Sequence, residues 1–428
     1  MHLKPYTPDR QLNFLHIPKT AGTTLRVLLE NRFHVDEICP AYDFLSLTAY
    51  PANELMEFRF FRGHMGYNLV NYLPERPYTL LMLRDPVKRT ISHFEYIKRD
   101  PAHPRHRQIH ERNLDLQSFL EDPALRIELE NSQTKPLSHN QSRERLIELS
   151  SSSSSMIEFQ EKWRRLNKGM SGQDMLELAL ARIEDIEFTG ITERFDESLE
   201  LVSWLTGLVP QERVQRLNTG SSPAGESALR QDTIDLIRES TRLDRELYDR
   251  ACRIFTERYA KTAALRASGR HALPGSRQKV EKGNLIIDFA GPIRGTGWHQ
   301  RELDQQFGYF RWTGPGTSTS LDLQLDKDRN YHIHVDIIDS MGEDITGSLR
   351  LSINERPLDT EIVPEGGRLS GRAWINRLLL DKGKEYDRLK LSVNRTVSQA
   401  GDQGNRINHN ASRECGIAIS RIMLIPDR

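Results

Sequence analysis

Four side chains and one glycine in a single short segment have the types and spacing of an anion-binding turn. The segment, His16 to Leu25, reads HIPKTAGTTL, and the residues that can bind an anion are Lys19, Thr20, Gly22, Thr23 and Thr24. An apolar stretch precedes it and an amphipathic run follows it, so the order predicts a strand, a tight turn and the start of a helix. Unpaired N–H groups and a partial positive charge at a helix start favour a phosphate or sulfate group. A threonine-capped helix after a plain surface turn is the alternative.

A second segment supplies an arginine and a serine that suit the same kind of ligand. Tyr78 to Leu83 is an apolar run typical of a buried strand, and Arg84-Asp85-Pro86 follows it. Aspartate caps helices well and proline fits a first turn, so a helix is predicted to begin here and to carry Ser92. The guanidinium fork of Arg84 matches a dianionic phosphate, and the Ser92 hydroxyl can join it. Alone, Arg-Asp-Pro is a common strand-to-helix junction. With the first segment, it predicts two anion sites at one sheet edge, as a nucleotide with phosphates at both ends requires.

His64 is the candidate general base. It follows a strand-like run, Glu57 to Phe61, in the sequence FFRGHMG, so we expect it just past a strand end. A neutral imidazole can accept a proton near pH 7. A packed, purely structural histidine is the alternative.

These residues need a parallel sheet to bring them together. Short apolar strands are predicted at Asn13–His16, Phe58–Phe61, Thr79–Leu83 and Glu187–Ile191. Helical patterns lie between them, and one long helix is predicted at about Asp232–Tyr259. Strands that alternate with helices predict a parallel sheet whose ligand site lies at the carboxyl ends of its strands. The serine run Ser150–Ser155 is predicted to be a loop, either a lid or an inert insertion.

The last third of the chain has a different periodicity. Residues 1–262 form the predicted α/β domain, 263–282 a linker, and 283–428 a domain of short alternating strands with Gly, Pro and Asn turns. Such strands predict an antiparallel β-sandwich. Its aromatic residues either stack on sugar rings or fill the core; they are Trp298, Tyr309, Phe310 and Trp312.

Composition narrows the class of protein. The chain has 428 residues, with 60 Lys plus Arg balanced by 60 Asp plus Glu, and a neutral chain argues against broad nucleic-acid binding. Its three cysteines are widely spaced, which suits a reducing compartment and neither a disulfide framework nor a zinc cluster. No stretch has the length and apolarity of a membrane helix, and the first strand follows the N-terminus closely. We therefore expect a cytoplasmic protein that is not an integral membrane protein.

Taken together, the two anion-binding segments resemble the 5′-phosphosulfate and 3′-phosphate loops of sulfotransferases that use 3′-phosphoadenosine 5′-phosphosulfate (PAPS). The motif HIPKTAGTT is most similar to that of the carbohydrate branch, which includes the heparan and uronosyl 2-O-sulfotransferases and bacterial relatives. Asn131-Ser-Gln-Thr-Lys135 resembles the Asn-x-Gln-Thr-Arg of that family, with a lysine in place of the arginine. The resemblance covers about residues 10 to 260 and implies a P-loop-like parallel sheet.

The resemblance implies transfer of a sulfuryl group from PAPS to a hydroxyl of a carbohydrate or glycoconjugate, with PAP as product and no metal required. His64 is then the base, and Lys19 stabilises the transferring group. The donor site comprises Lys19, Thr20, Gly22, Thr23, Thr24, Arg84 and Ser92. Five further residues are expected to contact the acceptor; they are Arg62, Arg105, Arg107, Gln133 and Lys135. Arg105 and Arg107 belong to a basic run, Lys98 to Arg112, that either steers an anionic glycan towards the site or forms a solvated face. An inactive glycan-binding protein and a P-loop-like nucleotide kinase are the alternatives, although no Gly-x-x-x-x-Gly-Lys-Ser/Thr is present. The sequence leaves the acceptor hydroxyl and the oligomeric state open.

Overall fold

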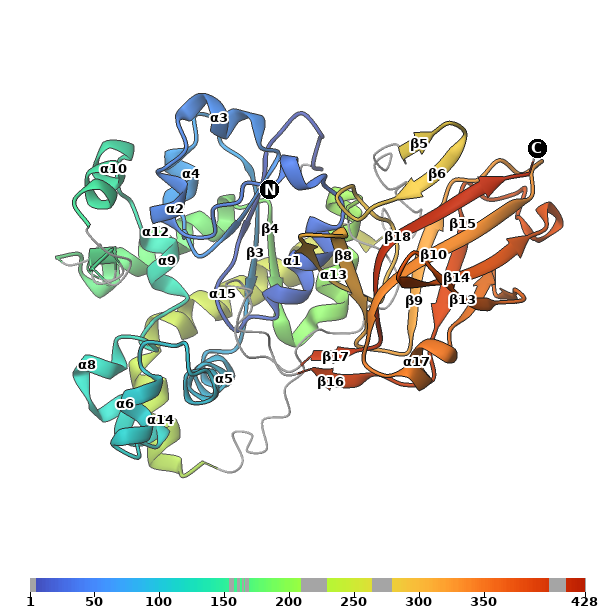
Figure 1. The fold of residues 1–428 in the computed structure, drawn as a ribbon. Helices are drawn as coiled ribbons and strands as arrows, with labels where there is room; N and C mark the ends of the chain where they lie inside the picture. Colours follow the sequence, from blue (N-terminus) through green and yellow to red (C-terminus); the bar gives the residue numbers. More distant parts are fainter. Residues whose placement is uncertain are drawn as a thin grey trace. The chain divides into compact units, whose positions relative to one another are not determined.

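The chain divides into two compact units in a computed structural model (Figure 1). The structure describes residues 5–153, 158–159, 162–163, 165, 169–208, 229–263, 279–399 and 413–427. The first unit takes the described residues of 1–26, 36–207 and 220–271, and the second takes those of 27–35, 208–219 and 272–428. Most of the linker expected at 263–282 lies outside the described residues, and Lys279–Glu281 forms a strand, β5.

Among the described residues, the first unit contains a four-stranded parallel sheet in the order β2-β1-β3-β4. Its strands are β1 (Leu12–Leu15), β2 (Phe60–Gly63), β3 (Tyr78–Leu83) and β4 (Phe188–Ile191), and every residue in them is buried. The register pairs Leu15 with Gly63 and with Leu81, and Leu83 with Ile191. The carboxyl ends of all these strands therefore lie at one edge of the sheet.

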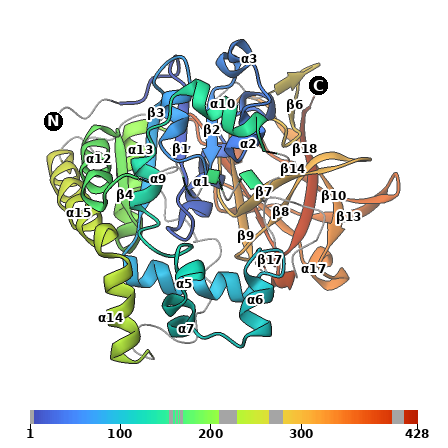
Figure 2. The ribbon, with the colours of Figure 1, turned by 90° about the vertical axis from the view of Figure 1, so that its left-hand side faces the viewer.

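Helices flank the sheet. Helices α13 and α15 contact β4, and Figure 2 shows them beside it together with α12. A separate apolar cluster joins α5, α6, α7 and α14, which lie together in Figure 2. The helix bounds are α1 Gly22–Glu30, α2 Phe44–Leu47, α3 Ala52–Glu57, α4 Asn68–Tyr72, α5 Pro86–Arg99, α6 His106–Glu111, α7 Leu116–Glu121, α8 Pro123–Arg126, α9 Thr134–Ser138, α10 Arg143–Ser151, α12 Gly172–Asp185, α13 Phe195–Thr206, α14 Gln231–Ser240 and α15 Arg242–Lys261.

The single long helix predicted at Asp232–Tyr259 is wrong, because the chain breaks at Thr241 into α14 and α15. The Thr241 hydroxyl donates to the carbonyl of Ile237 at 2.8 Å, and the Asn131 side chain accepts from the N–H of Leu243 at 3.0 Å. Asn131 thus caps the start of α15. Apolar periodicity could not show this break, since it continues through both helices.

The loop predicted for the serine run is also wrong at its start. Ser150 and Ser151 end helix α10, and the Ser151 hydroxyl donates to the carbonyl of Ile147 at 2.9 Å. Ser154 and Ser155 lie outside the described residues.

The second unit contains two antiparallel sheets that share one apolar core, in a β-sandwich-like arrangement. One sheet runs β13-β14-β10-β18-β6-β5, with β8 beside β18 and β7 beside β8; the other runs β12-β11-β15-β9. The bounds are β6 Asn284–Ile287, β7 Trp298–Asp304, β8 Gly308–Thr313, β9 Ser318–Leu323, β10 Tyr331–Ser340, β11 Arg350–Ile353, β12 Arg356–Pro357, β13 Glu361–Glu365, β14 Arg368–Ile375, β15 Asp387–Ser392 and β18 Ile417–Pro426. A short helix, α17 (Glu343–Gly347), and a small pair, β16 (Val397–Gln399) with β17 (Arg413–Cys415), complete the described part.

Two of the aromatic residues considered for sugar stacking are core residues instead. Trp298 and Trp312 are each 3% exposed, and the Trp298 indole N–H donates to the carbonyl of Ser320 at 2.9 Å. Tyr309 and Phe310 are half-buried and pack against the core clusters. Stacking on Trp298 or Trp312 is therefore excluded by their burial.

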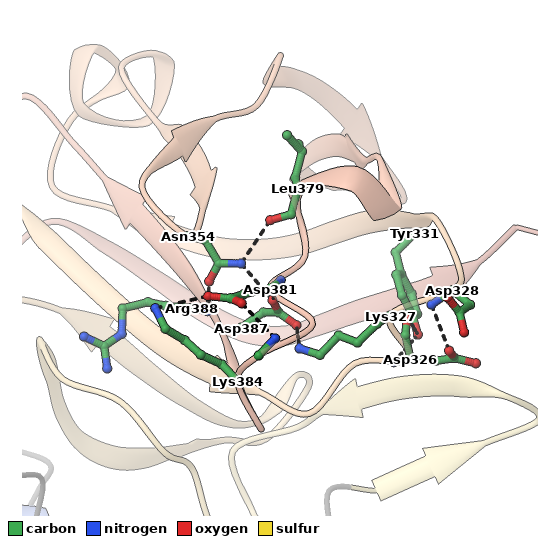
Figure 3. A network of polar contacts seen from close by, with 11 residues as sticks. Asp326, Lys327, Asp328, Tyr331, Asn354, Leu379, Asp381, Lys384, Asp387 and Arg388 are labelled. Atoms are coloured by element: carbon green, nitrogen blue, oxygen red, sulfur yellow. Dashed lines mark hydrogen bonds and ion pairs between the residues drawn. The ribbon is translucent and has the colours of Figure 1, made fainter.

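A buried carboxylate organises one end of the second unit (Figure 3). Asp387 is fully buried, pairs with Lys327 and accepts from the N–H of Asp381 at 2.8 Å. The Asn354 amide donates both to Asp387, at 2.7 Å, and to the carbonyl of Leu379, at 3.0 Å. The charge of Asp387 is thus paired and hydrogen-bonded, as a buried charge must be.

Among the described residues, no helix combines the length and the apolarity needed to cross a membrane.

Candidate functional site

Four polar residues lie directly after the four strands of the parallel sheet. His16 follows β1, His64 follows β2, Arg84 follows β3 and Thr192 follows β4. Since the strands are parallel and adjacent, these residues meet at one sheet edge, where ligands bind in open α/β sheets. The His16 and His64 rings lie 4.9 Å apart between centroids. The expected gathering of the first segment, His64 and Arg84 is therefore present.

The turn after β1 is held by hydrogen bonds to its carbonyl groups. Lys19 and Ala21 have positive φ angles of 69° and 60°, and such alternation exposes successive N–H groups to an anion. Each carbonyl of residues 17–20 accepts a hydrogen bond from a side chain. The pairs are Ile17 with Thr20 Oγ1 at 2.9 Å, Pro18 with Arg89 Nε at 3.1 Å, Lys19 with Arg84 Nη1 at 3.1 Å, and Thr20 with Thr192 Oγ1 at 2.9 Å. The carbonyl groups are thus occupied, and helix α1 starts directly after the turn with N–H groups that have no partner within the helix.

Positive charge is concentrated around this turn. Lys19 is half-buried, and its Nζ lies 4.8 Å from the centroid of the Tyr96 ring. Burial lowers the pKa of Lys19 most, and together with the nearby charges of Arg99, Arg84 and Arg89 it brings this pKa to about 8. A bound anion would relieve this repulsion.

The second segment forms as predicted. The Asp85 side chain accepts from the N–H of Lys88 at 3.0 Å, and Pro86 is the first residue of α5. Arg84 is half-buried at the end of β3, and Ser92 is half-buried on α5. Arg89 lies on α5 between them and is 2% exposed, which lowers its pKa to about 10. Two arginines of this segment therefore contact the first turn.

His64 has the hydrogen bonds of a neutral base. Its Nδ1–H donates to the carbonyl of His16 at 2.8 Å, which leaves Nε2 as the basic nitrogen. The ring is exposed at the surface, but protein atoms crowd its other sides, and this partial desolvation lowers the pKa of His64 below its ordinary value. Gly63, directly before His64, has a φ of +142°. A Cβ there would lie 2.1 Å from the carbonyl oxygen of Tyr42, so this position requires glycine.

His16 links the base to the first turn. Its ring is 8% exposed, Nδ1 lies 2.9 Å from the Tyr42 hydroxyl, and burial holds the pKa of His16 well below its usual range. The ring packs so close to the start of α1 that a Cβ on Gly22 would lie 2.4 Å from its Nε2. Gly22 is thus needed to seat His16 against the helix.

The three threonines of the expected donor site flank Gly22 in the sequence. Thr20 and Thr24 are buried, and Thr23 is half-buried in the first turn of α1.

The five residues expected to contact an acceptor each have a contact within the chain. Arg62 is buried on β2 and donates to the carbonyls of Cys39 at 2.6 Å and Ala41 at 3.2 Å. Lys135 pairs with Glu130 at 3.0 Å. The other three pairs are Arg105 with Glu128 at 3.2 Å, Arg107 with Glu111 at 2.6 Å, and the Gln133 amide with the backbone of Arg84. Of the five, only Gln133 is placed by these contacts directly at Arg84.

Sequence reasoning assigned no role to several residues of the site. Arg89 could have been found, because it lies three residues before Ser92 and so shares a face of α5 with it. Thr192 could have been found as the first polar residue after β4. Tyr42 and Asp244 have no comparable local signal, since they reach the site from a loop and from α15.

Comparisons with known proteins add little to this geometry. No family profile matches the chain, and neither does any curated protein. Among solved structures, a family 35 carbohydrate-binding module from Clostridium thermocellum aligns with 35% of this chain and 98% of its own, at 7% identity and a TM-score of 0.20. A family GH115 4-O-methyl-α-glucuronidase with specificity for decorated arabinogalactans aligns with 80% of this chain and 37% of its own, at 9% identity and a TM-score of 0.22.

Proposed function

We propose that the chain is a PAPS-dependent sulfotransferase that sulfates a hydroxyl of a carbohydrate or glycoconjugate. The donor, when bound, supplies an activated sulfuryl group, and its phosphate groups carry several negative charges. The turn of residues 17–22, with Lys19 and Thr23, would hold the 5′-phosphosulfate, and Arg84 with Ser92 would hold the 3′-phosphate. In this proposal the strand, turn and helix at the start of the sheet are P-loop-like.

The observation that carries the proposal is the turn itself. Its carbonyl groups are bound by Thr20, Arg84, Arg89 and Thr192, and burial together with nearby like charges lowers the pKa of Lys19. Preorganised N–H groups and cations at a strand end stabilise negative charge that develops on a transferring group. A group with several negative charges therefore fits this edge.

His64 would act as the general base. Its Nδ1–H is fixed by the carbonyl of His16, so Nε2 can accept the proton of an acceptor hydroxyl. The lowered pKa keeps His64 unprotonated near pH 7. Lys19 would hold its charge near the departing phosphate oxygen and so stabilise it.

Transfer of label from [³⁵S]PAPS to a panel of glycans, glycolipids and simple alcohols tests the proposal directly. Binding of PAP is measured in parallel by calorimetry, and ATP with Mg²⁺ is tested as the competing donor. Labelled product with PAPS supports the proposal. PAP binding and glycan binding without transfer would indicate the inactive glycan-binding alternative, and phosphoryl transfer from ATP would indicate the kinase.

Replacement of His64 tests its role as the base. His64→Ala should lower turnover by about 10² to 10⁴, the usual scale for loss of a general base, and should leave PAP affinity nearly unchanged. His332→Ala, which removes an exposed histidine of the second unit, is the matched control. Turnover of His64→Ala close to that of the wild type would remove His64 from the role.

A further inference from the structure

The side-chain amide of Gln133 bonds both backbone groups of Arg84. Its side chain is fully buried; Oε1 accepts from the Arg84 N–H at 3.0 Å, and Nε2 donates to the Arg84 carbonyl at 2.9 Å. These groups belong to the two peptide units on either side of the Arg84 Cα, so the amide fixes the Arg84 backbone on both sides. Arg84 in turn donates from its guanidinium to the carbonyl of Lys19 at 3.1 Å. The amide of Gln133 is therefore engaged at the arginine of the anion site.

Asp244 anchors the backbone that carries Gln133. This carboxylate is 1% exposed on α15 and accepts from the N–H of Gln133 at 3.1 Å with each oxygen. It also accepts from the N–H and the hydroxyl of Thr134, each at 2.7 Å. A second attachment runs from α15 to the turn, because the Asn131 side chain accepts from the backbone N–H of Leu243. The turn of residues 131–134 is thus bound to α15.

The same turn contacts the second arginine of the site. The Arg89 guanidinium donates to the Ser132 hydroxyl and to the carbonyl of Pro18. Burial lowers the pKa of Arg89, and the nearby Asp244 carboxylate partly opposes this shift. One short turn therefore supports both arginines that contact the anion-binding segment.

We infer that Gln133 is a positioning residue for the anion site, and that it acts through Arg84 rather than by contact with the acceptor. This inference rests on the proposed function, because Arg84 is the proposed ligand of the 3′-phosphate. Gln133 sets the place of the guanidinium, and Asp244 sets the place of Gln133. Loss of the Gln133 amide should therefore impair recognition of the 3′-phosphate specifically.

The test compares two nucleotides in full-length variants by calorimetry. The readout is the ratio of affinities for PAP and for adenosine 5′-phosphate, which lacks the 3′-phosphate. Gln133→Met keeps the side-chain size and removes the amide, and it should lower the ratio about tenfold, as expected for the loss of two neutral hydrogen bonds. Gln173→Met, at an exposed glutamine on α12, is the matched control and should leave the ratio unchanged.

A double-mutant cycle shows whether the effect passes through Arg84. Arg84→Ala should abolish the preference for PAP, and adding Gln133→Met to it should cause no further loss. Thr134→Val, which removes one hydroxyl bond to Asp244 and keeps the backbone, is a milder variant should Gln133→Met fold poorly, and it should lower the ratio about threefold.

Failure of the inference and failure of the proposed function give different results in this experiment. A wild-type chain that prefers PAP, combined with equal weakening of both nucleotides in Gln133→Met and in Thr134→Val, overturns the inference and leaves the proposed function intact. A wild-type chain without any preference for PAP overturns the proposed function, and the inference with it.

Discussion

His64 shows how a single hydrogen bond can select one form of a residue. The carbonyl of His16 accepts from Nδ1, and only a protonated Nδ1 satisfies that carbonyl. Partial desolvation then disfavours the imidazolium, with Arg26 and Arg89 adding repulsion. The result is a neutral ring with a basic Nε2, which is the form that proton abstraction needs.

The lowered pKa of Lys19 predicts an unusual basic limb in the pH profile. Lys19 carries its charge below about pH 8 and loses it above that pH, so kcat/KM for the donor should fall as pH rises through about 8. A bound anion favours the charged form and raises this pKa, so the corresponding limb of kcat should lie at higher pH. The measurement is a pair of pH profiles under donor-limited and donor-saturated conditions.

Lys19→Arg is the control for this profile. Arginine stays charged throughout the range, so the basic limb near pH 8 should disappear even if the rate is lower. A limb that persists in Lys19→Arg would show that another group is responsible.

At the scale of elements, the start of α1 depends on the absence of a side chain at Gly22. A Cβ there would lie 2.3 Å from Cδ2 and 2.4 Å from Nε2 of His16, so Gly22→Ala must displace the ring or the helix start. Transfer should then fall on the order of 10²-fold, the cost of a misplaced site. Steady-state rates and PAP affinity measure the effect.

Gly172→Ala is the matched control, because Gly172 is the first residue of α12 as Gly22 is of α1. A Cβ at Gly172 would meet Leu243 at an ordinary 3.6 Å. Equal activity of the two alanine variants would contradict the packing argument for Gly22.

The sequence could predict the elements of the site better than its contacts. All four sheet strands were expected within two residues of their observed ends, because each is a short apolar run between polar turns. The Asp85 cap and Pro86 were equally local signals. The pairing of Gln133 with Arg84, and of Asp244 with Thr134, joins residues 49 and 110 positions apart, and no local pattern encodes such pairs.

At the scale of the whole molecule, the candidate site and the core of the second unit belong to different units. The residues of the candidate site, from His16 to Asp244, belong to the first unit. The second unit is built around its own apolar cluster and the Asp387 network. Changes in that network should therefore affect stability without changing the chemistry at His64.

Asp387→Ala tests this separation. It leaves Lys327 without its buried partner and removes the acceptor for Asn354 and Asp381, so the unfolding free energy should fall by about 3 to 5 kcal/mol. Calorimetry of the full chain measures the shift, and sulfation of a small acceptor below the transition should stay unchanged.

Asp328→Ala, which removes an exposed partner of Lys382, is the control and should shift the transition little. Loss of activity with Asp387→Ala at low temperature would show that the two units are functionally coupled.

The bound carbonyls of residues 17–20 have a consequence for the thermodynamics of ligand capture. Because side chains from α5 and from the end of β4 already restrain this loop, an incoming anion gains its contacts without ordering the backbone first. Association should then resemble the filling of a rigid receptor. Amide exchange rates and order parameters in the loop would differ little between the empty and the loaded protein.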